Sequence, residues 1–511
     1  MENNTKRKTP YSIHTFMWPF RWSYVNMNDF GQKLTDDTNW KDIPFEIRSA
    51  TNYNEYVYFH SYVRSTLFSN GASNKDTVRY FEYSLEDEAS FEFSLVGKEE
   101  KIQLRIRGIS LHLFFTGVGI LTFQLENDKY LTVEKIQLIN DFGRRTYPQF
   151  LGSEDNADEN FRGINATKRT FLPDWIKAGY VVEKEDFSRY EKLEKTFGDS
   201  IIQPPAYIKA LFNQHFSFGE ANDKKSETII ITHLTDDRMF TLCWYPDPGL
   251  SDELKTISNQ KYGYLTSKKW YELIFCDSNQ NLTCQNDAML QEHIQKYTYE
   301  RWVDYGTLYG ITRDCLFCLT DREYFAKNLI LPHMQSIYYQ MSVLCLAQRA
   351  SIQKFSYDLG NIKHTELDSQ TKRDSLELQK QYLRFNNKLY FKEVTDQIQG
   401  IEMYQKMQKA MNIENVANQL DREIEELHNL LNMEESLQLS KDANTLAKIA
   451  TYAVPASLAM ALFALFSGDL NFSCSSNFLW GRFFAVSLLV VLSVIILIYG
   501  KWITNKIFKR R

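Results

Sequence analysis

Two long runs without a charged residue lie near the C-terminal end of the 511-residue sequence, at Ile449–Phe466 and Phe483–Tyr499. Each run is close to the length of roughly 20 residues that a helix needs to cross a bilayer core of about 30 Å. Only helices and closed barrels satisfy their backbone polar groups in lipid, so the runs predict two C-terminal transmembrane helices. A short loop, Ser467–Arg482, would join them.

The charges around these runs predict their orientation. Basic residues precede the first run and follow the second, at Lys441, Lys448, Lys501, Lys506, Lys509, Arg510 and Arg511. The intervening loop carries only Asp469 and Arg482 as charged residues. Positive charge favours the cytoplasmic side, so both termini are expected there, in a multi-pass protein of the cell inner membrane. Met1–Pro10 is polar and basic, which argues against a secretory signal.

One helical face of the first run is a candidate pore wall. Steps of three and four residues place a set of side chains on this face: Asn444, Lys448, Thr451, Pro455, Leu458 and Leu462. In an oligomer, Thr451 would form a polar ring and the two leucines a hydrophobic constriction able to gate by dewetting. The alternative is that this face contacts lipid and the hairpin only anchors the chain.

The chain before the hairpin predicts an α+β body followed by long helices. Period-two alternation through Thr77–Leu138 indicates an antiparallel sheet, and Ser12–Trp22 indicates a strand that Pro19 ends or places at a sheet edge. After Asp321 the apolar period becomes helical, with a seam of packing positions past Gly400. We therefore predict a sheet-rich cytoplasmic sensor domain over 1–322, with room for two subdomains. A long-helix stalk over 323–446 and the transmembrane hairpin with its basic tail over 447–511 complete the chain.

Charge and cysteine usage narrow the classes of function. The net charge of −5 does not favour a nucleic-acid-binding surface, so no direct nucleic-acid partner is expected. The seven cysteines form no disulfide or zinc pattern. Cys315 and Cys318 form a CxxC pair in a strand-like segment, where positions three apart point to opposite faces. We therefore predict that the cysteines are reduced and structural, and that the protein binds no metal or cofactor.

Arginines in the sheet-rich region are the candidate ligand site. Asn140–Pro148 contains adjacent Arg144 and Arg145 and then Tyr147, which could hold a phosphate while the ring stacks on a base. Arg105 and Arg107 on a predicted strand complete the candidate set. The alternative for Asn140–Pro148 is a solvated turn with surface ion pairs. We find no nucleophile–base pair, zinc signature or complete phosphate loop, so the chain is not predicted to be an enzyme.

The order of body, stalk and hairpin resembles the CorA family of metal-ion transporters. The local match is Ile449-Ala-Thr451, then three residues, then Pro455. This resemblance implies a homopentamer whose first span lines a central pore. Where the family has its Gly-Met-Asn filter, this chain has Ala464-Leu-Phe466, which leaves hydrated Mg²⁺ without its docking ring.

Four phrases of the body are similar to the CorA-like membrane effectors associated with type III CRISPR systems. They are His14-Thr-Phe-x-x-Pro-Phe20, Thr116-Gly-Val-Gly-Ile-Leu-Thr-Phe123, Asn140-Asp-Phe-Gly-Arg-Arg145 and the segment from Asn387 to Gly400. The resemblance implies an activating second messenger, a conjugate of S-adenosylmethionine and AMP, and an outcome in which the membrane barrier is disrupted.

Together these features predict a ligand-gated membrane pore of antiphage defence, with the membrane, a homo-oligomer and a nucleotide second messenger as partners. The alternatives left open are a CorA-type transporter of divalent Mg or Co ions and a membrane-tethered enzyme in the body.

Overall fold

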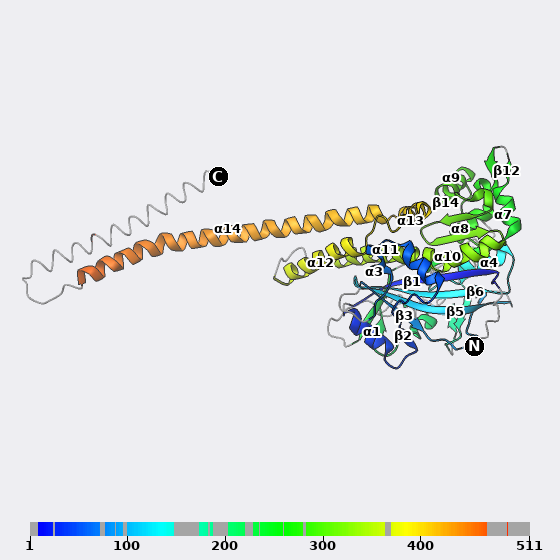
Figure 1. Cartoon of the computed structure of the whole chain (residues 1–511). Coiled ribbons are helices and arrows are strands. Elements are labelled where there is room, and N and C mark those ends of the chain that lie inside the picture. The colour runs from blue at the N-terminus through cyan, green and yellow to red at the C-terminus, as the bar shows by residue number, and fades with distance from the viewer. Residues whose placement is uncertain are drawn as a thin grey trace, which may run out of the picture. The chain divides into compact units, whose positions relative to one another are not determined.

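The computed structural model describes residues 9–23, 26–71, 77–86, 88–95, 100–147, 173–181, 184–187, 203–219, 228–234, 236–258, 260–278, 283–362, 369–467 and 488. The chain divides into two compact units, residues 1–422 and 423–511. The first unit contains all the described strands and most of the helices (Figure 1). The α+β class predicted for the body is confirmed, whereas the domain boundaries predicted at 322 and 446 stay predictions.

The described strands of the main sheet are β1 (Ser12–Trp22), β2 (Trp40–Asp42), β3 (Val78–Tyr83), β4 (Ser90–Leu95), β5 (Lys101–Phe114), β6 (Val118–Asn127), β7 (Pro173–Ala178), β8 (Glu185–Asp186), β9 (Phe216–Phe218), β10 (Ile229–His233), β11 (Phe240–Pro246), β14 (Thr298–Tyr299), β15 (Leu308–Ile311) and β16 (Cys315–Thr320). Their main order is β14-β15-β16-β11-β1-β6-β5-β4-β7-β8. β10 pairs with β1 and β9, and β3 pairs with β5 and β2. A separate two-stranded ribbon joins β12 (Ile257–Ser258) to β13 (Lys261–Tyr262).

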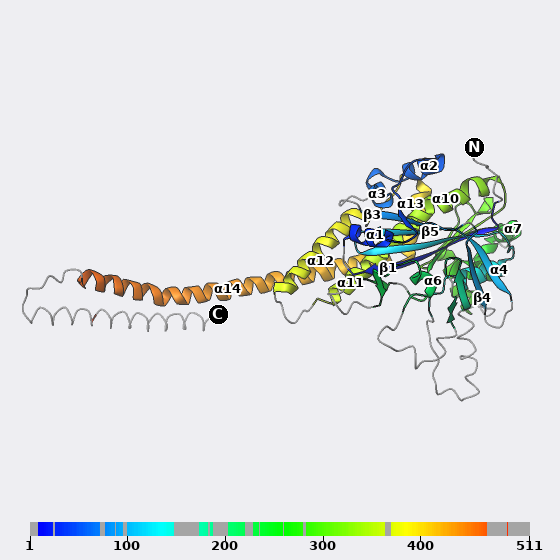
Figure 2. The same ribbon diagram turned by 90° about the horizontal axis from the view of Figure 1, so that it is seen from below.

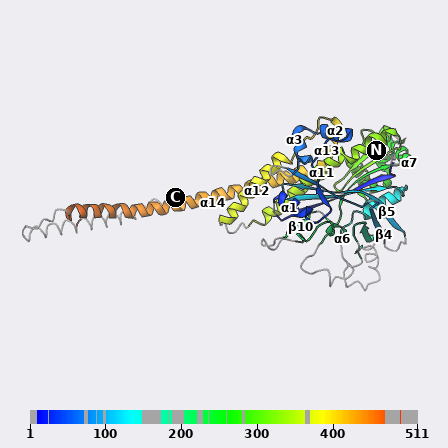
Figure 3. The same ribbon diagram turned by 60° about the horizontal axis from the view of Figure 1, so that its bottom comes forward.

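The described α-helices are α1 (Met27–Thr35), α2 (Ala50–Tyr58), α3 (Ser61–Leu67), α4 (Val133–Phe142), α6 (Ala206–Lys209), α7 (Pro248–Lys255), α8 (Lys268–Phe275), α9 (Asp287–Tyr297), α10 (Leu331–Gln335), α11 (Ile337–Gly360), α12 (Ser369–Lys388), α13 (Ile398–Ala410) and α14 (Ile413–Ser467). Short helical turns are η4 (Gly263–Thr266) and η5 (Val303–Tyr305), and the π-helical segment η6 (Ala326–Ile330) leads into α10. α2 and α3 lie beside α13 (Figure 3), where Thr395 donates a hydrogen bond to the Tyr58 carbonyl at 2.6 Å.

β1 is a central strand and not the short or edge strand that the sequence indicated. It pairs with β6 along nearly its whole length. Its other side pairs with β11 as far as Met17 and with β10 from Phe20 onward. Pro19 lies between these two partners, so its missing backbone N–H removes no ladder hydrogen bond on that side. The prediction that Pro19 ends the strand or marks an edge is therefore wrong.

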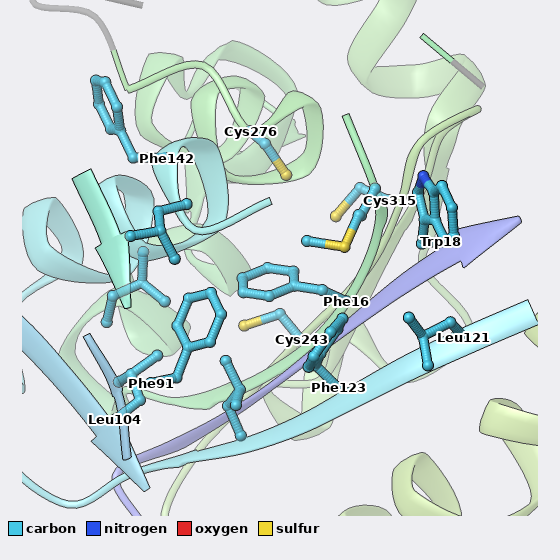
Figure 4. Close-up of a cluster of buried hydrophobic side chains, with 14 of the residues drawn as sticks. Phe16, Trp18, Phe91, Leu104, Leu121, Phe123, Phe142, Cys243, Cys276 and Cys315 are labelled. Carbon is cyan, nitrogen blue, oxygen red and sulfur yellow. The ribbon is translucent and has the colours of Figure 1, made fainter. Parts of the chain in front are cut away.

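Both faces of the central sheet are buried, which gives a three-layer arrangement in the first unit. Phe16 and Trp18 of β1 point into a large apolar cluster (Figure 4), which also contains Phe20 and residues of α1, α4 and α8. α10 and α11 cover the opposite face (Figures 1 and 2). α11 is buried nearly all round, between the sheet on one side and α12 and α13 on the other.

No described helix is long and apolar enough to cross a membrane. The first predicted span falls in α14, whose side chains are described as far as Ala461. The described side chains therefore cover only residues 449–461 of that run, with Lys448 directly before it. The second run, 483–499, lies outside the described residues except for Leu488.

The prediction of two C-terminal transmembrane helices is therefore contradicted. The membrane, ion-channel and multi-pass inner-membrane assignments that depended on those helices are corrected with it, whereas the homopentamer stays a prediction.

A tight contact between β1 and β6 allows a test of the central packing. Gly119 faces Phe20 across the strand pair, and a Cβ at position 119 would overlap the Phe20 ring. Gly119→Ala should lower the free energy of unfolding by about 1–3 kcal/mol, as overpacked cores do. Gly360→Ala is the control, because no atom lies within 4 Å of its added Cβ. That substitution near a helix end should be neutral or stabilising by up to about 1 kcal/mol. Equal denaturant midpoints for the two variants would contradict the packing described here.

A buried carboxyl between α2 and α11 predicts a pH dependence of stability. Burial raises the pKa of Glu55 to about 7, against the hydrogen bond that Gln340 donates to it at 3.0 Å. The folded state thus holds a proton that the unfolded chain releases near pH 4.5. The protonated Glu55 therefore adds on the order of 3 kcal/mol to the free energy of unfolding. This stabilisation is complete below pH 4.5 and is lost as the pH rises through 7. Glu55→Gln should flatten the profile of thermal midpoint against pH in that window, and an unchanged profile would assign the dependence to another group.

Candidate functional site

A β-bulge in β5 changes which residues face the two sides of the sheet. The register with β6 shifts between Ile106 and Gly108, which leaves Arg107 as the extra residue. Before the bulge, the β5 residues in the main apolar cluster have even numbers: Ile102, Leu104 and Ile106. After the bulge they have odd numbers: Ile109, Leu111 and Leu113. Bulges break the ladder locally and re-aim side chains. Here the bulge places Arg107 on the outer surface while both flanking stretches keep their apolar residues in the core.

A cavity of about 380 Å³ opens at this bulge, on the sheet face that α10 and α11 partly cover. Its walls come from β3, β5, β6 and the turn after β3: Tyr80, Glu82, Tyr83, Leu85, Glu86, Glu88, Arg105, Ile106, Arg107, Gly108, Ile109, Ser110 and Gln124. The volume lies in the range of about 300–1,000 Å³ that small-molecule sites occupy.

The two arginines of this cavity differ in how strongly they are paired. Arg105 forms ion pairs with Glu126 and, at 3.2 Å, with Asp128. Among the described residues, the one carboxylate that Arg107 approaches is Glu126, at 3.7 Å, and the Arg107 side chain is 40% exposed. Arg107 is therefore the guanidinium of this cavity that is most available to an incoming anion, with Arg105 fixed beside it.

Hydroxyl groups form the deep wall of the cavity, where α11 meets the sheet. The Ser110 hydroxyl lies 3.2 Å from the Tyr339 hydroxyl of α11, and Tyr80 donates to Glu82 at 2.8 Å. Arg107 and Gln124 also line a small adjoining space under Met334 and Gln335 of α10. Three residues of the cavity wall, Arg107, Ser110 and Gln124, thus also lie next to α10 or α11.

The opposite rim of the cavity is acidic. Glu82, Glu86 and Glu88 line it and are exposed. The lining therefore has a cationic side on β5 and an anionic side on β3 and the turn after it. A ligand that carries both a positive and a negative group would match this distribution better than a simple anion.

The other predicted ligand residues lie away from this cavity. Arg145 is buried between Asp141, at 2.7 Å, and Asp237. Burial lowers the pKa of Arg145, but these two carboxylates outweigh it and raise the pKa overall. Tyr147 packs edge-to-face on His233, with ring centroids 5.4 Å apart. Arg144 is 1% exposed, with one hydrogen bond of 3.5 Å to the Cys276 carbonyl.

The structure thus brings Arg105 and Arg107 together at one cavity and does not bring Arg144, Arg145 or Tyr147 to it. The alternative of a solvated turn with surface ion pairs does not describe Arg144 and Arg145 either, because both are buried. The predicted pore-lining residues all lie on α14, where the Thr451 hydroxyl donates to the Ala447 carbonyl at 2.7 Å and the Leu458 side chain is 64% exposed. Their pore assignment falls with the membrane spans.

A buried histidine network connects two of the sequence phrases singled out above. His14 Nδ1 lies 2.7 Å from Asn140 Oδ1 and 3.7 Å from Cys243 Sγ, and the Ser12 hydroxyl lies 2.8 Å from His14 Nε2. Burial lowers the pKa of His14 to about 4, against the bond to Asn140, and burial raises the pKa of the Cys243 thiol. All four side chains are fully buried. The network therefore hydrogen-bonds both ring nitrogens of His14 in the core, and burial favours the protonated form of the Cys243 thiol.

Comparison with protein families, curated proteins and solved structures gave no match for this chain. Within the described ranges, no group of His, Cys, Asp and Glu residues is placed to hold a metal ion. The site therefore has to be interpreted from its own geometry.

Sequence reasoning found the two arginines of the cavity but missed most of its walls. Tyr80 of β3 and Gln124 of β6 come from separate segments, and only the pairing of both strands with β5 brings them together. One usable signal was present. The switch of apolar positions from even to odd between Ile106 and Ile109 marks the bulge directly.

Stability measurements should separate the structural arginine from the available one. Arg145→Gln removes the cation that pairs with buried Asp141 and leaves Asp237 only the weaker ion pair with Arg238 at 3.4 Å, and should cost about 3–5 kcal/mol of unfolding free energy. Arg107→Gln alters an exposed, weakly paired side chain and should change stability by no more than about 0.5 kcal/mol. Chemical denaturation of both variants tests this, and a large loss for Arg107→Gln would make that residue structural.

Proposed function

We propose that this protein is a sensor that binds a nucleotide-type second messenger in the cavity at the β5 bulge. The observation that carries the proposal is the exposed, weakly paired guanidinium of Arg107 at the wall of a ligand-sized cavity. A guanidinium binds phosphate through two parallel N–H···O bonds, which gives both affinity and orientation. Arg105, held by Glu126 and Asp128, adds a second positive charge without having to be ordered on binding.

The charge distribution favours a ligand with two poles. A phosphate at Arg107 would place the rest of the ligand along the cavity toward Glu82, Glu86 and Glu88. The S-adenosylmethionine–AMP conjugate implied by the sequence resemblance has a phosphate as well as the cationic sulfonium and ammonium groups of its methionine part. Tyr80 and Tyr83 supply aromatic surface at the same wall for a base. We propose that the conjugate binds in this orientation and that the protein is a non-enzymatic sensor in antiphage defence.

The position of the cavity also supports a way to report occupancy. Arg107 and Gln124 line both the cavity and the small space under α10, and the Tyr339 hydroxyl of α11 meets the cavity wall at Ser110. A ligand shifts a conformational equilibrium only by its differential affinity for the two states. A ligand that draws Arg107 away from Glu126 would act directly on residues that contact α10 and α11.

Isothermal titration with the S-adenosylmethionine–AMP conjugate tests the site. Arg107→Glu should weaken binding by at least about thirtyfold, which corresponds to about 2 kcal/mol for a lost charge-assisted contact. Arg48→Glu is the matched control, because the Arg48 side chain is 74% exposed and pairs only with nearby Glu46. Unchanged affinity of Arg107→Glu would remove the cavity from the proposal.

The acidic rim has its own test in the same titration. Replacing Glu82, Glu86 and Glu88 together by glutamine should abolish the preference for the conjugate over AMP, while AMP affinity stays the same or rises. If the preference survives, the cationic part of the ligand binds elsewhere.

A further inference from the structure

Gly108 is the residue of the cavity wall, among those that the structure describes, that has no side chain. A glycine inside a strand weakens the strand, because it loses much conformational freedom on folding and packs no side chain against its neighbours. Such a glycine often marks a place where a ligand or another backbone approaches closely. Glycine at position 108 therefore has either a folding reason or a functional one.

The fold gives no reason for a glycine at position 108. Its backbone lies outside the positive-φ region that favours glycine, unlike that of Gly117 at the turn between β5 and β6. Apart from the adjacent residues, an added Cβ would have one described atom within 4 Å, the Gln124 Oε1 at 3.6 Å. That separation is ordinary van der Waals contact. Neither backbone conformation nor packing therefore excludes a side chain here.

Gly108 lies where one edge of β5 passes from one partner strand to another. β3 pairs with this edge as far as Glu82–Ser110, and β4 begins to pair with it at Ser90–Arg105. Among the described residues, no strand pairs with β5 between these two points, and the cavity opens there. The backbone around Gly108 is thus exposed to the cavity at a gap in the sheet.

A side chain at position 108 would point into the cavity. Side chains two residues apart on a strand share a face, so position 108 shares the face of Ser110. Gly108 also pairs across the sheet with Gln124, and both Ser110 and Gln124 line the cavity. Arg107 directly precedes Gly108, and Ser110 pairs with Glu82 of the acidic rim. Gly108 therefore lies between the cationic and the acidic side of the cavity.

We propose that Gly108 is a specificity-determining position, whose bare backbone leaves room for the part of the ligand that joins its phosphate to its cationic groups. This inference rests on the proposed function, because Arg107 sets where the phosphate binds. A ligand with its phosphate at Arg107 crosses position 108 to reach Glu82 and Glu86. The ligand class is then a phosphoester that carries an extended organic cation, and a side chain at position 108 excludes it by occupying the same space.

Isothermal titration of Gly108→Val with the S-adenosylmethionine–AMP conjugate tests the proposal. Valine suits a strand and fills the space over the backbone, so its affinity should be at least about tenfold weaker than that of the wild type. Its denaturant midpoint should be no lower than that of the wild type, because a Cβ at this position meets no close contact. Gly360→Val is the matched control, since the same change falls in open space at the opposite end of α11 from Tyr339, and it should bind like the wild type.

Gly108→Ala separates the effect on the ligand from any folding defect of the valine variant. Its methyl group meets only the Gln124 side chain, so the denaturant midpoint should be no lower than that of the wild type. Its affinity should lie between those of the wild type and Gly108→Val. A lower midpoint for Gly108→Ala would make Gly108 a structural glycine and overturn the proposal.

The Arg107→Glu variant distinguishes the two proposals that share this cavity. Weakened binding in Arg107→Glu with unchanged affinity in Gly108→Val would overturn the role of Gly108 alone. Unchanged affinity in both variants would overturn the proposed function as well.

Discussion

The strand β1 is the element on which the rest of the first unit depends. It is hydrogen-bonded on both sides and buried on both faces, because β6, β11 and β10 flank it while the aromatic cluster and α11 cover it. Such a strand has no free edge and no solvated face, so its sequence is largely apolar throughout and departs from strict alternation. The aromatic cluster packs on one face of β1 and α11 on the other, so β1 positions the elements on both sides of the sheet.

The bulge in β5 makes room for a polar cavity in a sheet that is otherwise covered on both faces. A sheet covered on both faces leaves little room for a polar site unless one strand changes its pattern part-way. Arg107 is the residue at which β5 makes that change, from a face that meets solvent to one packed under α11. The cavity therefore lies at the boundary between the covered and uncovered parts of the same sheet face, next to the helices that a bound ligand could move.

Most of the strands could be predicted from the sequence, since alternation at β3, β4 and β5 is local and strong. Cys315 and Cys318 were correctly placed on a strand, and the helical texture after Asp321 was correctly predicted. The site was only half predicted. Arg144 and Arg145 suggested a phosphate-binding pair, yet burial beside Asp141, Asp237 and Cys276 gives them other partners. Adjacent residues on a turn carry no local signal of what distant segments will cover them.

The apolar run from Ile449 shows the limit of composition as a guide. Its lack of charge predicted a transmembrane helix, whereas no helix among the described residues, α14 included, is long and apolar enough to span a membrane. The sequence by itself determined the local periods, the α+β class and the position at which β5 changes face, because each depends on neighbouring residues alone. The tertiary structure decided which arginine is available and which carboxylates are paired, because charge compensation and burial depend on segments distant in the sequence, such as Arg145 and Asp237, which are 92 residues apart.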